Sequence, residues 1–295
     1  MDYVNQFSTE AKILALRITG MVGPRTFEML LAHFKTVDAI FEADEEELRH
    51  IDGIGKKRSL EIFEARDNLE KAQKIIDNLG AFDAKTVIYS QPEYPVILNE
   101  INDPPPLLFY RGHLPEEQEK RVAIIGSQDV SAEGIGDAVE LASRLVENNV
   151  SIVGGLARGI DTAGHIGALK AGGRTYAVLP CGIDTIYPSE NEAITKEITE
   201  HGGLISEYLP GTQPSAGHLI NRNRLIVGLS QAVVIGEMSA ESVGTLDAAQ
   251  CCHELGKLLF AVIGTTNPHY EKLLEYGAIP LTNIAEYELI LKSLV

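Results

Sequence analysis

The sequence contains no tryptophan, only three cysteines and no apolar run long enough to cross a lipid bilayer. An odd cysteine count with Cys251 next to Cys252 suits neither a disulfide framework nor a zinc cage, so these residues and Cys181 are expected to be structural thiols. No cationic segment precedes an apolar core near the N-terminus, which argues against a secretory signal. We therefore expect a cytoplasmic protein without membrane contact, bound metal or cofactor.

Positive charge is also scarce. The chain has 25 lysines and arginines against 42 aspartates and glutamates, for a formal net charge of -17. Binding a polyanion normally requires a strong positive field. Any contact with nucleic acid is therefore expected to be local rather than spread over a basic surface.

The first ~80 residues lack strand alternation and predict short helices joined by glycine-centred turns. Gly53-Ile54-Gly55 lies between two apolar-periodic segments and is followed by Lys56-Lys57-Arg58. This pattern is typical of a helix-hairpin-helix, in which turn amides at a helix N-terminus can contact phosphate. The acidic residues 44–47 leave a purely structural packing hairpin as the alternative. We predict a small helical domain, similar to SAM and helix-hairpin-helix domains, over residues 1–82.

A proline-rich segment, residues 83–120, is predicted to be a connector and an edge segment. From residue 121 onward, short β-branched runs bounded by glycine or proline alternate with helical stretches. The runs are VAIIG, VSIVGG, TYAVLP, GLISEY, AVVIGE and LLFAVIG. This alternation predicts an α/β domain over residues 121–295, with a doubly wound, Rossmann-like, mostly parallel sheet covered by helices on both faces.

Ligands of such sheets bind beyond the carboxyl ends of the strands, so the residues that follow each run are candidate site residues. Glycines 126, 134 and 136 do not fit the dinucleotide fingerprint, so no NAD or FAD site is expected. The strand-end residues suited to an anion, through amides, hydroxyls or guanidinium groups, are Gly155, Arg158, Gly159, Asn221, Arg222, Arg224, Gly244 and Thr245. Arg222 and Arg224 would project together in an extended segment and diverge in a helix.

Candidates for catalysis are few. His165, His218 and His253 have no partner in a metal-binding or nucleophile motif, and no GxSxG sequence is present. Asp161, directly after Gly159-Ile160 at a helix start, is more simply a helix cap than an acid or base. We expect no catalytic residues and a protein that is not an enzyme.

The run GGLARGIDTAGHIGALKAGGRTYAVLPCGIDTIYPSEN, together with LISEYLPGTQP and NRNRLIVGLSQAVVIGE, resembles the DprA/Smf family of DNA-processing proteins. The resemblance covers nearly the whole chain. It implies an extended Rossmann-like fold, a homodimer, protection of incoming single-stranded DNA, and delivery of that DNA to the RecA recombinase during natural transformation. It also implies a DNA pocket formed by Gly126, Ser127, Gly155, Arg158, Gly159 and Asp161, with positive charge from Arg174, Arg222 and Arg224.

Several residues depart from the family pattern. The arginine that usually follows the first Gly-Ser or Gly-Thr is Gln128, and the usual Phe-Pro-Arg before the paired arginines is Leu219-Ile220-Asn221. SAESVGTLDAA replaces the family's Ser-Gly-Ser-Leu-Ile-Thr segment. Each lost phosphate contact is expected to weaken binding and to flatten its salt dependence by about one unit.

Two other functions remain open. VGTLDAA is similar to the phosphate loop of lysine-decarboxylase-like nucleotide phosphoribohydrolases, so the same cleft could bind or hydrolyse a nucleotide, with Glu237 as the acid or base. The helical domain could instead dock a partner protein. The DNA-binding hypothesis requires Arg158, Arg174, Arg222 and Arg224 to converge and to remain free of carboxylate partners.

Overall fold

The structure is a computed structural model that describes residues 2–262 and 268–294. The chain forms two compact units. Unit 1 comprises Met1–Tyr94 and Asn102–Phe109, and unit 2 comprises Pro95–Ile101 and Tyr110–Val295. No helix of the described residues is both long and apolar enough to cross a membrane.

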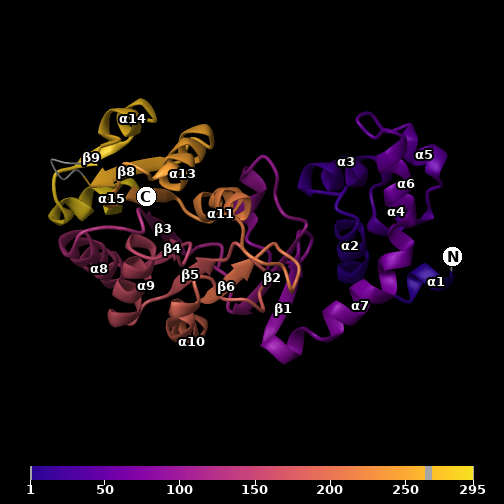
Figure 1. The fold of residues 1–295 in the computed structure, drawn as a ribbon, viewed down its shortest axis with the longest axis horizontal. Helices are drawn as coiled ribbons and strands as arrows, with labels where there is room; N and C mark the ends of the chain where they lie inside the picture. Colours follow the sequence, from indigo (N-terminus) through magenta and orange to yellow (C-terminus); the bar gives the residue numbers. More distant parts are fainter. Residues whose placement is uncertain (1, 263–267, 295) are drawn as a thin grey trace. The chain divides into compact units, whose positions relative to one another are not determined.

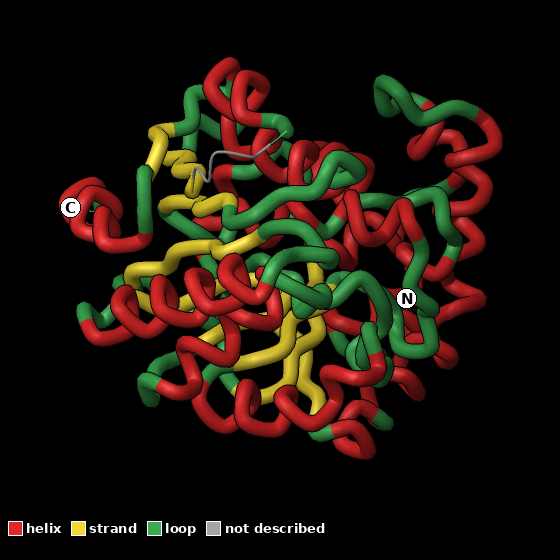
Figure 2. The backbone as a smooth tube through the Cα atoms, turned by 60° about the vertical axis from the view of Figure 1, so that its left-hand side comes forward, coloured by secondary structure: helices red, strands yellow, loops and turns green. Residues whose placement is uncertain are grey.

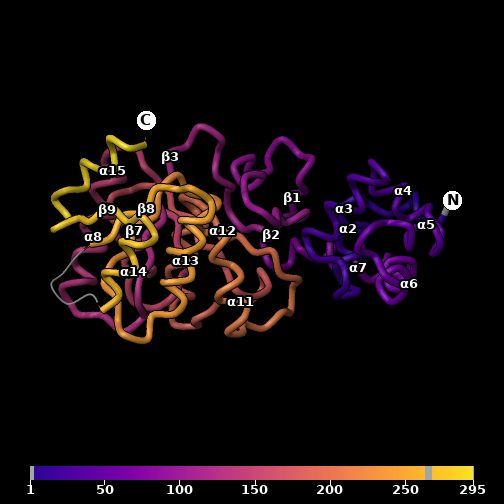
Figure 3. Tube along the Cα trace, turned by 90° about the horizontal axis from the view of Figure 1, so that it is seen from above, coloured from indigo at the N-terminus to yellow at the C-terminus, as the bar shows by residue number. Residues whose placement is uncertain are grey.

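Unit 1 is mainly helical, and Figure 3 shows its helices in indigo and violet. Its helices are α1 (Asp2–Asn5), α2 (Thr9–Ile18), α3 (Pro24–Phe34), α4 (Val37–Glu42), α5 (Glu45–Arg49), α6 (Lys56–Glu64) and α7 (Leu69–Asp77). Strand β1 (Ala84–Ile88) follows and lies next to β2 (Leu107–Gly112). Helix α2 packs against α7, and its apolar residues form the centre of this unit.

The glycine turn between α5 and α6 has the predicted hairpin geometry. Gly53 has a φ of 80°, a left-handed conformation that favours glycine, and Gly55 precedes α6 without a side-chain cap. Ile54 is buried beneath the turn, whereas Lys56 and Lys57 are exposed. The helix-hairpin-helix prediction is confirmed as a fold feature, and its contact with DNA stays a prediction.

The six predicted strands of unit 2 all form. They are β3 (Lys120–Ile125), β4 (Val150–Gly154), β5 (Thr175–Val178), β6 (Gly203–Ser206), β7 (Ala232–Ile235) and β8 (Leu258–Val262). A further short strand, β9 (Ile279–Leu281), was not predicted, because two of its three residues are exposed and it has no apolar run. These strands are parallel and lie in the order β6-β5-β4-β3-β7-β8-β9.

Helices cover both faces of this sheet, as Figures 1 and 2 show. They are α8 (Ala132–Glu147), α9 (Ile160–Lys170), α10 (Glu192–His201), α11 (Ala216–Asn221), α12 (Asn223–Gly228), α13 (Val243–Glu254), α14 (Tyr270–Glu275) and α15 (Tyr287–Ser293). Helix α8 packs against α9 on one face, and α12 packs against α13 on the other. Because both faces are covered, β4, β5, β6 and β7 are buried along their whole length. The predicted Rossmann-like, doubly wound fold is confirmed.

The strand order reverses beside β3. The chain passes from β3 through β4 and β5 to β6 on one side, then returns to β7 on the other side of β3. The loops that leave β3 and β7 therefore diverge toward opposite faces of the sheet. Such a switch point leaves a crevice beyond the carboxyl ends of the strands, where open α/β sheets bind their ligands.

Candidate nucleic-acid interface

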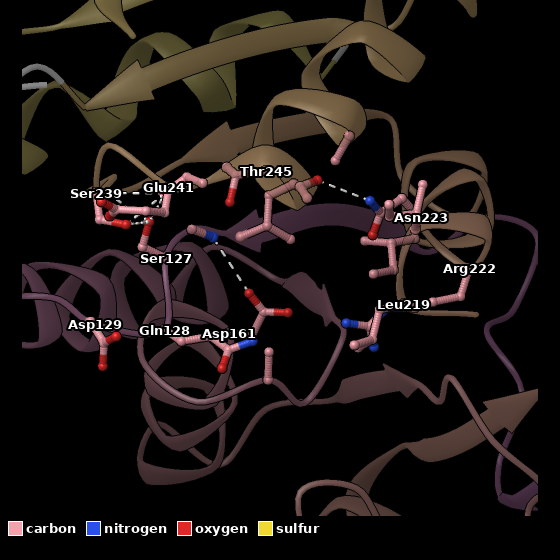
Figure 4. Close-up of a pocket in the computed structure, with 18 of the residues that line it drawn as sticks. Ser127, Gln128, Asp129, Asp161, Leu219, Arg222, Asn223, Ser239, Glu241 and Thr245 are labelled. Atoms are coloured by element: carbon pink, nitrogen blue, oxygen red, sulfur yellow. Dashed lines mark hydrogen bonds between the residues drawn. The ribbon is translucent and has the colours of Figure 1, made fainter. Parts of the chain in front are cut away.

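A cavity of about 550 Å³ opens at this switch point. It lies between the loops that follow β3 and β7, the start of α9, helices α11 and α12, and the first turn of α13, as Figure 4 shows. Its size falls within the roughly 300–1,000 Å³ typical of small-molecule sites. Of the predicted site residues, Gly126, Ser127, Asp161, Arg222, Gly244 and Thr245 line it.

Asp161 and Arg222 form the floor of the cavity. Both are 4% exposed. The Asp161 carboxylate accepts a hydrogen bond from Gly155 N at 2.8 Å and a longer one from Gly126 N at 3.4 Å (Figure 4 shows the latter). Burial raises the pKa of the Asp161 carboxyl, and the Arg222 guanidinium and these amides oppose that shift.

The Arg222 guanidinium is held by backbone oxygens. Its Nη1 donates to Gly155 O and, at 2.5 Å, to Val178 O, whereas its buried Nε has no hydrogen-bond partner among the residues described. Burial lowers the pKa of Arg222, and Asp161 opposes this effect. A buried donor without a partner is energetically costly.

Two predicted glycines position the floor without lining it. A Cβ on Gly155 would lie 2.1–2.3 Å from the Arg222 guanidinium, so only glycine leaves room for that group. Gly159 has a φ of 73°, and a Cβ there would lie 2.2 Å from Ser127 O. Gly155 therefore lets the Arg222 side chain approach the backbone, and Gly159 lets two backbone segments approach each other closely.

The first turn of α13 lines the cavity and has amides that are free within the described residues. Gly244 N and Thr245 N donate no hydrogen bond to any residue that the structure describes. The Asn223 side-chain amide donates to Gly244 O at 3.0 Å and to the Asp247 carboxylate at 2.9 Å. These hydrogen bonds fix the orientation of the peptide group between Gly244 and Thr245. The predicted helix start at Gly244-Thr245 is confirmed, and such amides bind anionic or carbonyl oxygens.

Three serines form a hydroxyl cluster on the same side. Ser127 Oγ and Ser242 Oγ are hydrogen bonded, and Ser239 N donates to both oxygens, at 2.8 and 3.0 Å. Ser239 and Ser242 were not among the predicted site residues. Since both follow β7 closely, the rule that strand-end residues form the site would have found them.

The expected cluster of four arginines does not form. Arg158 and Glu190 make a two-pronged ion pair in which both side chains are about half exposed. Arg224 pairs with Glu207 at 2.7 and 2.9 Å. The segment is helical, so Arg222 and Arg224 diverge, and only Arg222 reaches the cavity. Asn221, at the end of α11, is exposed and does not line the cavity.

Arg174 lies at the opposite edge of the sheet. It directly precedes β5, so it is at the amino end of a parallel strand, and it pairs with Glu116 at 2.7 Å. Its placement in the pocket was wrong, because strand direction puts a residue before a strand far from the residues that follow strands. The cavity instead has the carboxylates of Asp129, Asp161 and Glu241 in its lining.

The groups considered for catalysis have structural partners. Glu237 accepts hydrogen bonds from Ser131 N at 2.9 Å and Ser131 Oγ at 2.5 Å, which stabilises the start of α8. Burial lowers the pKa of His165 to about 3 and raises that of Cys181 to about 11 and of Cys252 to about 12. At neutral pH these three side chains are uncharged, and the two thiols are protonated.

A doubly wound parallel sheet with a ligand-sized cavity at its switch point defines a Rossmann-like α/β protein, a class whose members bind ligands beyond the carboxyl ends of the strands. Within this class, the chain belongs to the DNA recombination-mediator protein A family, also called DprA/Smf, whose model matches residues 85–288. A model of a SAM-like helix-hairpin-helix tandem matches residues 15–66.

Individual relatives agree with this assignment. Protein Smf of Synechocystis sp. is 33% identical over 259 residues, which cover 86% of this chain and 65% of that protein. The chain thus spans slightly less than two thirds of the length of this curated relative. The X-ray structure of DNA processing protein A from Streptococcus pneumoniae matches with a TM-score of 0.80 and 29% identity, covering 95% of this chain and 97% of that one. A structure of DNA processing protein A from Helicobacter pylori, which concerns its single-stranded DNA binding mode, matches with a TM-score of 0.63 and 29% identity, covering 72% and 97%.

Proposed function

We propose that this protein binds single-stranded DNA at the cavity beyond β3 and β7 and is not an enzyme. The observation that carries the proposal is the switch-point cavity, lined by Arg222 and by the start of α13, whose first amides are free within the described residues, in a member of a DNA-recombination family. The single-stranded DNA binding mode of the Helicobacter pylori relative supports the same ligand class. In keeping with the family, the protein acts as a homodimer that protects incoming DNA and loads RecA.

Few phosphate contacts are expected in this complex. Arg158 and Arg224 are engaged by carboxylates, and Gln128 adds no charge. Because each phosphate contact with a single strand contributes a slope of about -0.7 to log K against log salt, the salt dependence should be shallow.

The test is fluorescence anisotropy with oligo-dT and with a mixed duplex over a salt series. Single-strand preference with a shallow slope is expected, and equal affinity for the duplex would contradict the proposal. The variant Glu190→Gln releases Arg158 and should raise the affinity severalfold and steepen the slope by about 0.7. Glu197→Gln, on α10 and outside the cavity, is the matched control.

The alternative, a nucleotide phosphoribohydrolase, is tested in parallel. Nucleoside monophosphates are incubated with the protein, and free base is measured. Base release that disappears in Glu237→Gln would replace the DNA-binding proposal with the enzymatic one. RecA loading is tested by the rate of RecA filament formation on single strands coated with a single-strand binding protein, and dimerisation by analytical ultracentrifugation.

A further inference from the structure

A second cavity, of about 220 Å³, opens at the amino ends of β3 and β7 in unit 2. Its lining comes from the 3₁₀ helix Val96–Glu100 and the residue before it, from the turn that precedes β3, from Arg121 on β3, and from Gln231, the residue before β7. It shares no lining residue with the switch-point cavity, which lies at the carboxyl ends of the same strands. This cavity is therefore a separate place on the molecule.

The second cavity contains a buried guanidinium group that has no ion pair. Arg121 is 2% exposed, and its Nε and Nη1 donate to Leu229 O and Glu116 O, each at 2.6 Å. Its Nη2 has no hydrogen-bond partner, and the group has no carboxylate partner, among the residues described. Burial lowers the pKa of Arg121, and the charge of Glu119 opposes this shift.

The Nη2 of Arg121 is open to the cavity. Of the buried side-chain nitrogens without a partner, Arg222 Nε is fully shut from solvent, whereas Arg121 Nη2 is not and belongs to a residue of the cavity lining. A guanidinium N–H only donates, so the group that completes it must supply an acceptor oxygen. A ligand in the second cavity is expected to carry such an oxygen.

The rest of the lining favours a ligand that is positively charged and partly apolar. Three glutamates contribute exposed side chains, Glu100, Glu116 and Glu117. Glu100 pairs with Lys257 and Glu116 with Arg174, whereas Glu117 has no partner among the described residues. Val96, 51% exposed, adds an apolar surface. These carboxylates would repel an anion and attract an amine or a guanidinium group.

Simple ions satisfy only part of this lining. A metal ion or a polyamine supplies no acceptor oxygen for Arg121, and a phosphate or a free carboxylate meets three glutamates. A lysine or arginine residue within a peptide supplies a neutral carbonyl oxygen, a methylene chain and a cation together. The volume, below the roughly 300 Å³ at which small-molecule sites begin, suits one residue of a longer segment.

We infer that the second cavity binds one lysine or arginine residue of a basic, extended segment of a partner protein. The backbone carbonyl of that residue accepts a hydrogen bond from Arg121 Nη2, its methylenes pack against Val96, and its cationic group lies among the glutamates. Because this site is at the amino ends of the strands, the switch-point cavity stays open. The protein can therefore hold a partner and its other ligand at the same time.

The experiment is NMR titration of isotope-labelled protein, observing the Val96 methyl groups and the Gln231 side-chain amide. The probe is the blocked tripeptide acetyl-Val-Lys-Val-amide. Replacing its central lysine with norleucine should weaken binding about tenfold, and replacing it with glutamate should abolish binding. Hexylamine, which has the cation and the methylenes but no carbonyl, should also bind about tenfold more weakly. Absence of shifts with the lysine peptide, equal binding of the lysine and norleucine peptides, or shifts at Ser242 in place of Gln231 overturns the inference.

Variants of exposed residues test the two contacts without disturbing the buried Arg121. Glu117→Gln should weaken the lysine peptide about threefold and leave the norleucine peptide unchanged. Val96→Ser should weaken both peptides equally. Glu271→Gln, on α14 and outside the cavity, is the matched control and should change neither. Equal losses for both peptides in Glu117→Gln overturn the inference.

A second copy of this chain is the competing occupant, because Lys56 and Lys57 are exposed. Spectra of the protein alone are recorded over a range of concentrations. Concentration-dependent shifts at Gln231 that disappear in Lys56→Ser or Lys57→Ser would assign the cavity to self-association and overturn the partner-protein inference. Spectra that do not change with concentration, together with binding of the lysine peptide, support it.

Discussion

In unit 2, the amino ends of the parallel strands form one edge of the sheet, and their carboxyl ends form the opposite edge. The two edges differ in how completely their polar groups are hydrogen bonded. At the amino edge, the Glu119 carboxylate accepts hydrogen bonds from Tyr176 Oη and Ser151 Oγ, and Arg174 is also close to it. At the carboxyl edge, the Arg222 Nε and the first amides of α13 have no partner within the described residues. The side chains named at the amino edge thus bond to one another, whereas the carboxyl edge has donors without a partner among the described residues.

Chain direction explains this difference. Each crossover helix of a parallel sheet begins near the carboxyl ends of the strands, so the free amides of helix N-termini collect at that edge. The amino edge receives no such donors, and the side chains named there pair with one another. A binding site at the carboxyl edge and a structural network at the amino edge follow from the same topology.

The largest expected effect tests the buried floor of the carboxyl edge. Asp161→Ala removes the acceptor for Gly155 N and the charge that balances Arg222, so the free energy of unfolding should fall by about 3 kcal/mol or more. Urea denaturation followed by circular dichroism measures it. Glu116→Ala at the amino edge removes a 70% exposed partner of Arg174 and should change stability by less than about 0.5 kcal/mol. Similar losses of unfolding free energy in the two variants would contradict the difference between the two edges.

The next effect concerns the stability that is lost at low pH because His165 is buried. His165 is fully buried, its Nδ1 is 2.6 Å from Thr175 Oγ1, and burial lowers its pKa to about 3. The unfolded chain, with a histidine pKa near 6.5, binds the proton first, so stability is complete above that value and is lost as the pH falls toward 3. Between pH 7.5 and 5.5 the loss should be about 1.4 kcal/mol. His165→Leu should remove most of this pH dependence, and an unchanged profile in the variant would assign it to other groups.

A smaller effect should separate stability from binding. Tyr176→Phe deletes the hydroxyl that donates to Glu119 at 2.9 Å, so unfolding should become easier by about 1 kcal/mol. Because this network lies at the amino edge, the affinity for oligo-dT should not change. Denaturation and anisotropy on the same preparation test both statements, and an affinity loss above threefold would show that the two edges are coupled.

The smallest effect concerns the misplaced arginine. Arg174→Gln should leave the salt dependence of oligo-dT binding unchanged and alter stability by less than about 0.5 kcal/mol, since the side chain is half exposed in its pair with Glu116. A salt titration with the variant and the unchanged protein provides the measurement. A shallower salt dependence of oligo-dT binding in the variant would show that Arg174 belongs to the binding surface.

The sequence predicted most of the fold but only part of the candidate site. The six buried strands were visible as β-branched runs, because a parallel sheet covered on both faces needs continuous apolar segments. The strand-end rule placed Arg222, Gly244 and Thr245 at the cavity, and the family resemblance added Gly126, Ser127 and Asp161. The short β9 was not predicted because it is partly exposed. The division of the chain into three parts at residues 82 and 120 stays a prediction.

By itself, the sequence determined the strand pattern, the helix starts and the glycines that permit close approach, since these depend on local periodicity and backbone conformation. Only the tertiary structure decided which charges meet. Glu190 and Glu207 are distant in sequence from Arg158 and Arg224 yet neutralise them, and Arg222 is buried against Gly155. Electrostatic partners are chosen by distances across the folded chain, so a cluster of arginines in the sequence does not predict a positive surface.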